Sequence, residues 1–326
     1  MHFSQVEAAL ASFLLSALFL VALKAVSVRR HFLISQGVPL IGGISMGLAF
    51  FAVFLWAGPS IANLPREVKG ILIASALILG AGVFDDQREL SVIQKFGVQL
   101  IAASILVAFG VRTNFVYVGD AWNIAVSLLW IVGITNAINL LDVMDGLAGG
   151  ASLVILAGFG VISAMNGDLL TLTLACVLGG AVFGFWIFNI PPAKVYMGNS
   201  GSHFLGIVLA AIGLTARYAT LERAVALLAP LLFLGFPILD TLLLILVRLQ
   251  KGSSVFKKSK DHMALRLLEK GYSKKKALIM MMGWSLFFVV SGLIMSKAPN
   301  FLGLMILAVA GLGSFFLIKK MRRAQI

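Results

Sequence analysis

The feature that most constrains this chain is a series of apolar stretches of about 20 residues each, the length a helix needs to cross a bilayer. Inside lipid only helices and closed barrels satisfy their backbone, and the ten-residue alternation of a barrel is absent. The sequence predicts an all-α, polytopic membrane protein of ten or eleven transmembrane helices, forming a single domain over 1–326. The eleven stretches are 7–26, 40–58, 69–84, 96–110, 122–140, 147–165, 169–189, 203–219, 224–247, 277–296 and 300–318.

Composition excludes the common soluble classes. The chain is 60% hydrophobic and 12% charged, against about 45–50% and about 25% in an ordinary soluble domain. The net charge of +13 would suggest nucleic acid in a soluble protein, but here basic loops on the cytoplasmic side explain it better, and no nucleic-acid partner is expected. The lone Cys176 excludes a disulfide or a thiolate metal site.

The distribution of basic residues predicts the orientation. If the N-terminus lies outside, 20 of the 26 Lys and Arg fall on the inner side. The first stretch is then a retained helix and not a cleaved signal peptide. The segment 248–276 becomes a basic cytoplasmic loop, placed against anionic headgroups or phosphates. A multi-pass protein of the inner (plasma) membrane is expected.

Acidic residues are costly in a membrane and often mark function. In this orientation four separate segments carry acids to the inner face, as a divalent-metal and phosphate site requires. The acids are Asp85, Asp86, Glu89, Asp142, Asp145, Asp240, Asp261 and Glu269.

The adjacent pair Asp85 and Asp86 ends an apolar stretch. Two neighbouring carboxylates repel unless a proton or cation compensates them, and Mg²⁺ prefers such oxygens together with substrate phosphates. The alternative is a solvated helix end, which the following Arg88 would suit.

A run of amides and acids at three-residue intervals lies at the end of the predicted stretch 122–140. Asn136, Asn139, Asp142 and Asp145 precede Gly146. On a helix each step of three drifts by about 60°, so neighbours share a face while the ends diverge. Amides beside carboxylates suit a base or ribose, although Asn and Asp also cap helices routinely.

Two further segments have the chemistry to bind phosphate. Gly198, Ser200 and Gly201 form a small-residue turn that opens a helix, whose free N–H groups favour an anion, or Ser200 simply caps that helix. In the basic loop, Arg248, Lys260 and His262 are candidates to clamp a diphosphate. The positive-inside bias alone would also place most of these charges there.

Asp240 is an acid inside the predicted span 224–247. An intramembrane acid is a candidate functional residue, or it pairs with a basic residue or a polar helix end.

Five motifs, in order, resemble the polyprenyl-phosphate N-acetylhexosamine-1-phosphate transferases, above all the undecaprenyl-phosphate N-acetylglucosamine-1-phosphate branch and more distantly the phospho-N-acetylmuramoyl-pentapeptide transferases. The motifs are GVPLIGGIS (37–45), DDQRELSVIQK (85–95), NAINLLDVMDG (136–146), KVYMGNSGS (194–202) and the loop 240–272.

The resemblance implies an enzyme with a cytoplasmic active site that moves a sugar-1-phosphate from a UDP-sugar to polyprenyl phosphate, releasing UMP and starting a cell-envelope glycan. Mg²⁺ is the implied cofactor, with Mn²⁺ as an alternative. The resemblance assigns Asp85 and Asp86 to metal binding or to deprotonating the lipid phosphate. Position 199 also contacts the metal, while Asn139, Asp142, Asp145 and Tyr196 line the nucleotide site, and Lys95 and His262 meet phosphate. The sequence leaves open whether the chain forms a homodimer.

The chain departs from the family pattern at three places. Asn199 stands where the family has a metal-binding Asp, Val143 replaces a Gly, and Ala264 and Leu265 replace two of three loop histidines. A neutral amide binds Mg²⁺ more weakly than a carboxylate. Two alternatives therefore stay open: a catalytically degenerate member that binds the nucleotide-sugar or lipid, and, less favoured, an ion-coupled transporter that uses Asp240.

Overall fold

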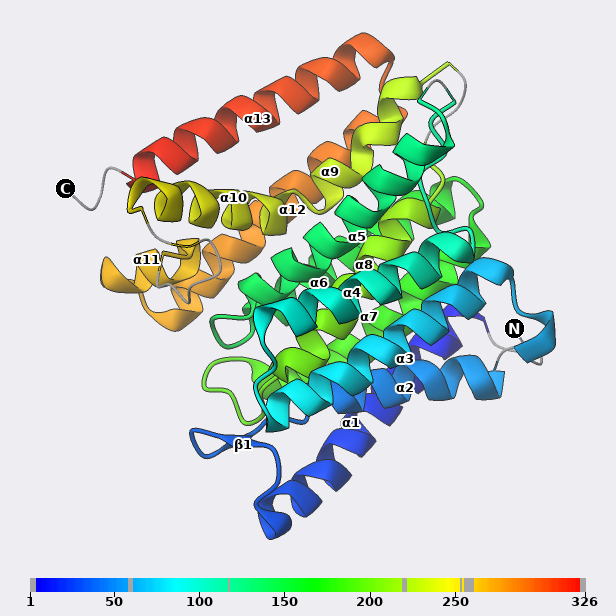
Figure 1. The fold of residues 1–326 in the computed structure, drawn as a ribbon. Helices are drawn as coiled ribbons and strands as arrows, with labels where there is room; N and C mark the ends of the chain where they lie inside the picture. The colour runs from blue at the N-terminus through cyan, green and yellow to red at the C-terminus, as the bar shows by residue number, and fades with distance from the viewer. Residues whose placement is uncertain are drawn as a thin grey trace.

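The computed structural model describes residues 4–57, 61–116, 118–218, 222–252, 254 and 261–322, and they form a helical bundle with one short hairpin (Figure 1). The predicted all-α polytopic fold is confirmed. The longer helices are α1 (Gln5–Arg30), α2 (Gly42–Ala57), α3 (Arg66–Gln87), α4 (Val92–Ala108), α5 (Asp120–Leu141), α6 (Leu147–Met165), α7 (Leu169–Asn189), α8 (Gly198–Thr215), α10 (Gly235–Gln250), α12 (Lys274–Lys297) and α13 (Asn300–Arg322). The short elements are β1 (Ile34–Ser35), β2 (Val38–Pro39), η1 (Ile61–Asn63), η2 (Ala224–Leu228), α9 (Ala229–Phe233) and α11 (Met263–Glu269).

Polar caps define where several helices start. Ser4 and Glu7 form a reciprocal capping box on α1, and Ser91 and Gln94 form another on α4. The Asp168 side chain accepts from the first turn of α7. Each cap satisfies N–H groups that the helix cannot pair internally and contributes about 1 kcal/mol.

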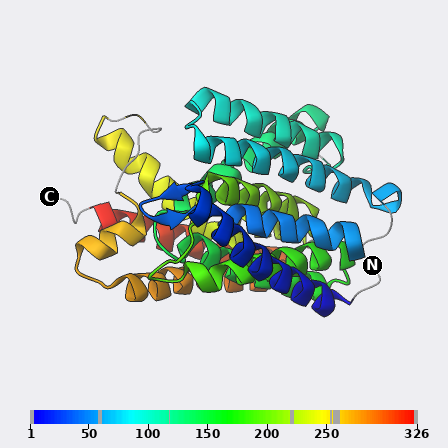
Figure 2. The same cartoon turned by 90° about the horizontal axis from the view of Figure 1, so that it is seen from below.

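Each of the eleven predicted stretches lies over helix, but not all the helices are long enough to span on their own. Within the described residues, seven helices are long and apolar enough to cross a membrane, or eight if a bent pair counts as one span. The helices α2 and α4 have only 16 and 17 residues. The described chain starts and ends at opposite ends of the bundle (Figures 1 and 2).

The stretch 224–247, predicted as one continuous span, is instead broken. The helical segment Ala224–Phe233 meets α10 at a bend of 67°. Pro237 lies in the first turn of α10 and has no N–H to donate to the carbonyl four residues earlier, and Gly235 weakens the junction further. The bend sets α10 at an angle to the rest of the bundle (Figure 1).

Helix α8 lies at the centre of the bundle and positions the polar residues at its start. Fourteen of its 18 residues are buried, because α2, α3, α5, α6 and α7 all pack against it. Gly201 allows α2 to approach closely, since a Cβ there would lie 2.7 Å from the Cα of Gly43. Bulky apolar side chains such as Phe204 then fill the core along the helix.

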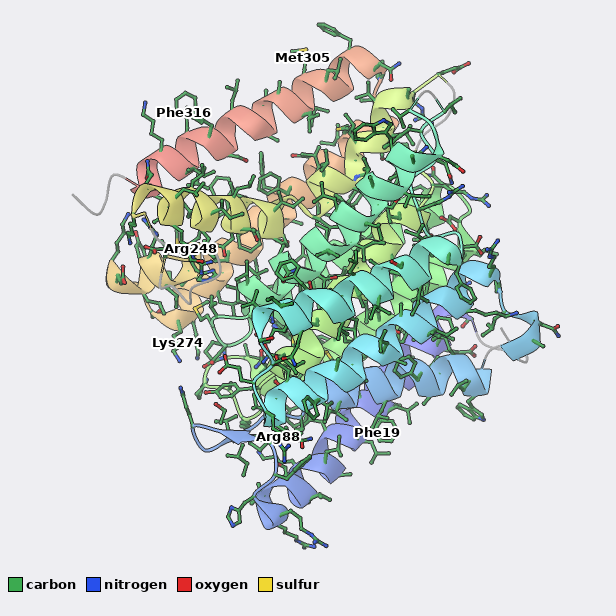
Figure 3. All side chains as sticks on the ribbon, in the orientation of Figure 1. Phe19, Arg88, Arg248, Lys274, Met305 and Phe316 are labelled. Carbon is green, nitrogen blue, oxygen red and sulfur yellow. The ribbon has the colours of Figure 1, made fainter. Side chains whose placement is uncertain are left out.

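The periphery of the bundle is apolar and exposed, as expected of a surface that meets lipid. Helix α13 lies at the edge (Figure 1), and its Phe316 is 62% exposed. The labelled side chains of Met305 and Phe316 point outward in Figure 3.

The connections that the sequence places on the inner side lie together at one end of the bundle, on the left in Figure 1. The β1–β2 hairpin is joined there to the segment before α8, because the Tyr196 N–H donates to the Pro39 carbonyl and the Gly42 N–H donates back to that of Tyr196. Polar segments far apart in the sequence are therefore neighbours at this end.

Candidate active site

A pocket of about 940 Å³ opens at this end of the bundle. All four carboxylates of Asp85, Asp86, Asp142 and Asp145 line it, so the predicted convergence of sequence-distant acids is present in the structure. The candidate residues that line the pocket are Asp85, Asp86, Asn139, Asp142, Asp145, Tyr196, Gly198, Asn199, Arg248 and His262. Lys260 lies outside the described residues.

Asp86, in the last turn of α3, occupies the N-terminus of α8. Its two oxygens accept from the N–H of Asn199 at 2.7 Å and of Ser200 at 3.0 Å. Gly198 makes this approach possible, because it has φ +74° and a Cβ there would lie 2.6 Å from Asp86 Oδ2. The helix start that the sequence predicted for a bound phosphate thus already holds an anion from the protein itself.

Asp85, beside it, is buried and held by protein groups. Its Oδ1 accepts from the Leu90 N–H at 2.7 Å, and its Oδ2 lies 2.8 Å from Lys95 Nζ. Lys95, predicted to bind phosphate, does not line the large pocket and instead neutralises Asp85.

The Asn/Asp run divides between the pocket and the helix interface. The Asn139 amide donates to Ser202 Oγ at 2.8 Å and to Asn199 Oδ1 at 3.3 Å. Asn136, one turn deeper, exchanges hydrogen bonds with Gln99 of α4 and does not line the pocket. The ends of the run diverge as its three-residue spacing predicts.

Asp142 follows the last residue of α5. Burial, and then the nearby charges of Asp86 and Asp145, raise its pKa from about 3.8 to about 7. It lines the pocket and accepts no hydrogen bond that ties it to another described residue. Burial and the two neighbouring acids both disfavour the charged form of Asp142, and a bound cation would favour it.

We expect the raised pKa of Asp142 to appear in the stability of the protein without metal. The folded protein holds a proton there that the unfolded chain releases near pH 4, so stability should fall as pH rises from about 4 through about 7. The measurement is the Tm of detergent-solubilised protein in EDTA between pH 5 and 8. Asp142→Asn should flatten the profile, and an unchanged slope in that variant would contradict the assignment.

The opposite wall of the pocket is basic. Arg248 of α10, His262 just before α11 and Lys274 at the start of α12 line it, and Arg248 and Lys274 are labelled together at this end in Figure 3. Lys274 Nζ lies 3.2 Å from Asp145 Oδ2, across the mouth. The pocket therefore sets acids against bases, as binding a metal-bound diphosphate requires.

Comparison of the sequence with known proteins identifies the family. The sequence model of the family described as "Glycosyl transferase family 4" matches residues 68–217. A probable undecaprenyl-phosphate N-acetylglucosaminyl 1-phosphate transferase of Bacillus subtilis is 30% identical over 280 residues, covering 83% of this chain and 77% of the relative. The chain belongs to this family. It is an integral-membrane sugar-phosphate transferase, and the predicted resemblance is confirmed.

Other members of the family show the same relationship. A decaprenyl-phosphate N-acetylglucosaminephosphotransferase of Mycobacterium tuberculosis is 34% identical over 284 residues, which cover 76% of this chain and 69% of the relative. A phospho-N-acetylmuramoyl-pentapeptide-transferase of Geobacillus kaustophilus is 32% identical over 201 residues, which cover 56% of this chain and 62% of the relative. The two branches named from the motifs are both present among the relatives.

Sequence reasoning missed two residues of this transferase that organise the pocket. Lys274 was counted only as part of the basic loop. Asn189, at the end of α7, accepts from the Gly146 N–H at 2.9 Å and donates to the Val195 carbonyl at 2.9 Å, and so ties the two acidic connections together. The available signal was a single amide ending a long apolar run.

The positions where the transferase departs from its family have different surroundings. Leu265 and Val143 line the pocket, whereas Ala264 is buried among apolar side chains of α10, α11 and α12. Ser200 and Gly201 are buried behind the pocket wall. Of the three loop positions where the resemblance implies histidines, His262 alone has an imidazole in this chain.

Proposed function

We propose that this transferase moves an N-acetylhexosamine-1-phosphate from a UDP-sugar to undecaprenyl or another polyprenyl phosphate, in the plasma (inner) membrane. The products are a polyprenyl-diphosphate-sugar and UMP, and the reaction starts a cell-envelope glycan. The single observation that carries the proposal is the convergence of four carboxylates and three basic side chains on one pocket at the ends of apolar helices. We place this pocket on the cytoplasmic side, as the basic loops favour.

Mg²⁺ is the cofactor we propose, with Mn²⁺ as the alternative. Among the described residues, no three His, Cys, Asp or Glu side chains could hold a metal ion by themselves. Mg²⁺ in phosphoryl-transfer sites needs only one or two carboxylates, with substrate phosphates and water completing the shell. Asp86 and Asp142 meet this requirement. The negative charges of Asp86 and Asp145 repel that of Asp142, so a cation bound there would be stabilised. When bound, the ion would neutralise charge on the diphosphate.

This metal assignment differs from the one made from the motifs. Asp85 is already neutralised by Lys95, so we assign it to holding the end of α3 and the start of α4. Asn199, through its side-chain carbonyl, would add a neutral ligand at most.

The rest of the pocket fits the two substrates. Asn139, Asp145 and Tyr196 offer acceptors and donors to a nucleoside. Arg248, His262 and Lys274 would bind the diphosphate. A phosphate oxygen of the lipid attacks the β-phosphorus of the UDP-sugar, a new P–O bond forms, and the bond to the α-phosphate breaks to release UMP. Positioning and charge neutralisation supply the catalysis, with no covalent enzyme intermediate.

The direct test uses the purified full chain with polyprenyl phosphate. UMP release and formation of the lipid product are followed over a panel of UDP-sugars and divalent ions. We expect turnover with at least one UDP-N-acetylhexosamine. Absence of turnover across the whole panel would overturn the proposal.

Asn199 gives a direct test of the alternative function, that of a catalytically degenerate member. Asn199→Asp restores a carboxylate beside Asp86 and Asn139. In an active enzyme we expect it to lower the Mg²⁺ concentration needed for half-maximal rate by about tenfold. Turnover that exists only in the variant would identify the natural chain as degenerate.

A further inference from the structure

Asp240 is a buried acid that the function above does not use. It lies in α10 and is 2% exposed. Its Oδ2 is 2.8 Å from Nδ1 of His262, and its Oδ1 accepts from the Met263 N–H at 2.8 Å. One buried carboxylate therefore holds both the imidazole and the first residue of α11.

This contact decides which nitrogen the ring presents. An ionised carboxylate only accepts hydrogen bonds, so Nδ1 must carry the proton that it shares with Asp240. Nε2 has no hydrogen-bond partner among the described residues, and His262 lines the pocket although only 3% of the residue is exposed. With both groups buried, the ring has little freedom to turn.

We propose that Asp240 is a positioning residue, which fixes the tautomer and orientation of His262 so that Nε2 serves the pocket. This inference rests on the proposed function, since it takes His262 as a ligand of the diphosphate. The need for such a device is plain in this chain. Ala264 and Leu265 follow closely in the sequence and carry no imidazole, so neither can replace a misplaced His262. A purely structural role, joining α10 to α11, is the alternative.

Asp240→Asn separates the two roles because the Met263 N–H fixes the orientation of the new amide. The amide oxygen would stay on that N–H, which turns the NH₂ group toward His262 and makes Nδ1 the acceptor. The chain has four histidines, so ¹⁵N-histidine NMR of the full protein in detergent is practicable, with the signal assigned by His262→Gln. We expect a protonated Nδ1 in the natural protein and an unprotonated Nδ1 in the variant. An unchanged Nδ1 would overturn the proposal.

Activity provides the second readout. We expect Asp240→Asn to lower kcat by about 10- to 100-fold with little change in KM. When it is added to His262→Ala, we expect kcat to fall by less than about threefold relative to His262→Ala alone. Equal costs in both backgrounds would mean that Asp240 acts independently of His262, against the proposal. Asp168→Asn is the matched control, since Asp168 is also buried and caps α7 through Thr171 while accepting from the Arg217 N–H. It should leave kcat unchanged.

Two further outcomes keep the tests separate. If Asp240→Asn does not fold, Asp240→Glu retains the carboxylate, and a ring that lacks the Nδ1 proton in that variant would contradict the proposal. If the natural protein turns over no UDP-sugar, the proposed function fails, and the NMR measurement still decides whether Asp240 sets the tautomer.

Discussion

Asp86→Asn should abolish most of the turnover, by about three orders of magnitude, while the protein stays folded. The natural carboxylate accepts from two N–H groups at the start of α8 and adds a negative charge beside Asp142. The amide loses that charge and turns one NH₂ group toward a backbone donor. Loss of several kcal/mol of charge stabilisation at the transition state accounts for the size of the effect.

Asp120→Asn is the matched control for this variant. Asp120 begins α5 at the opposite end of the bundle, where its side chain is 77% exposed and pairs with Arg112. That variant should keep full turnover. Measured side by side as UMP release, an Asp86→Asn enzyme retaining more than about a tenth of the natural rate would remove Asp86 from the machinery.

Much of the fold could be predicted because lipid leaves few solutions. Apolar length alone predicted eleven stretches that each lie over helix, since a chain in a bilayer must pair its backbone within each segment. The bend at Leu234 could not be predicted in this way. Pro237 and Gly235 can be read from the sequence, but packing decides whether such residues kink a span or end it.

The site shows where sequence reasoning stops. Asn136 carries the same chemistry as Asn139, and only the neighbouring helix reveals that Gln99 takes both its hydrogen-bonding groups. At Ser200 the inference of an anion at a helix start was sound, yet the anion is Asp86, from a segment more than a hundred residues earlier. Spacing along the chain cannot identify partners that tertiary packing supplies.

Lys95 provides the second large effect, on stability. Lys95→Met leaves the Asp85 carboxylate, whose side chain is 3% exposed, without its counter-charge. Removing one partner of a buried pair typically costs about 3 kcal/mol or more, because the other charge stays desolvated. We therefore expect the Tm of the detergent-solubilised protein to fall by several degrees.

Adding Asp85→Asn to Lys95→Met should recover most of that loss, because the amide is neutral and its oxygen can still accept from the Leu90 N–H. Lys274→Met is the matched lysine control: Lys274 also pairs with an acid, Asp145, but its side chain is 57% exposed. An exposed pair contributes little, so this Tm should move by less than about one degree. If instead Lys95→Met leaves the Tm unchanged and raises KM for the UDP-sugar, Lys95 is a phosphate ligand, as its motif first suggested, and its pairing with Asp85 is secondary.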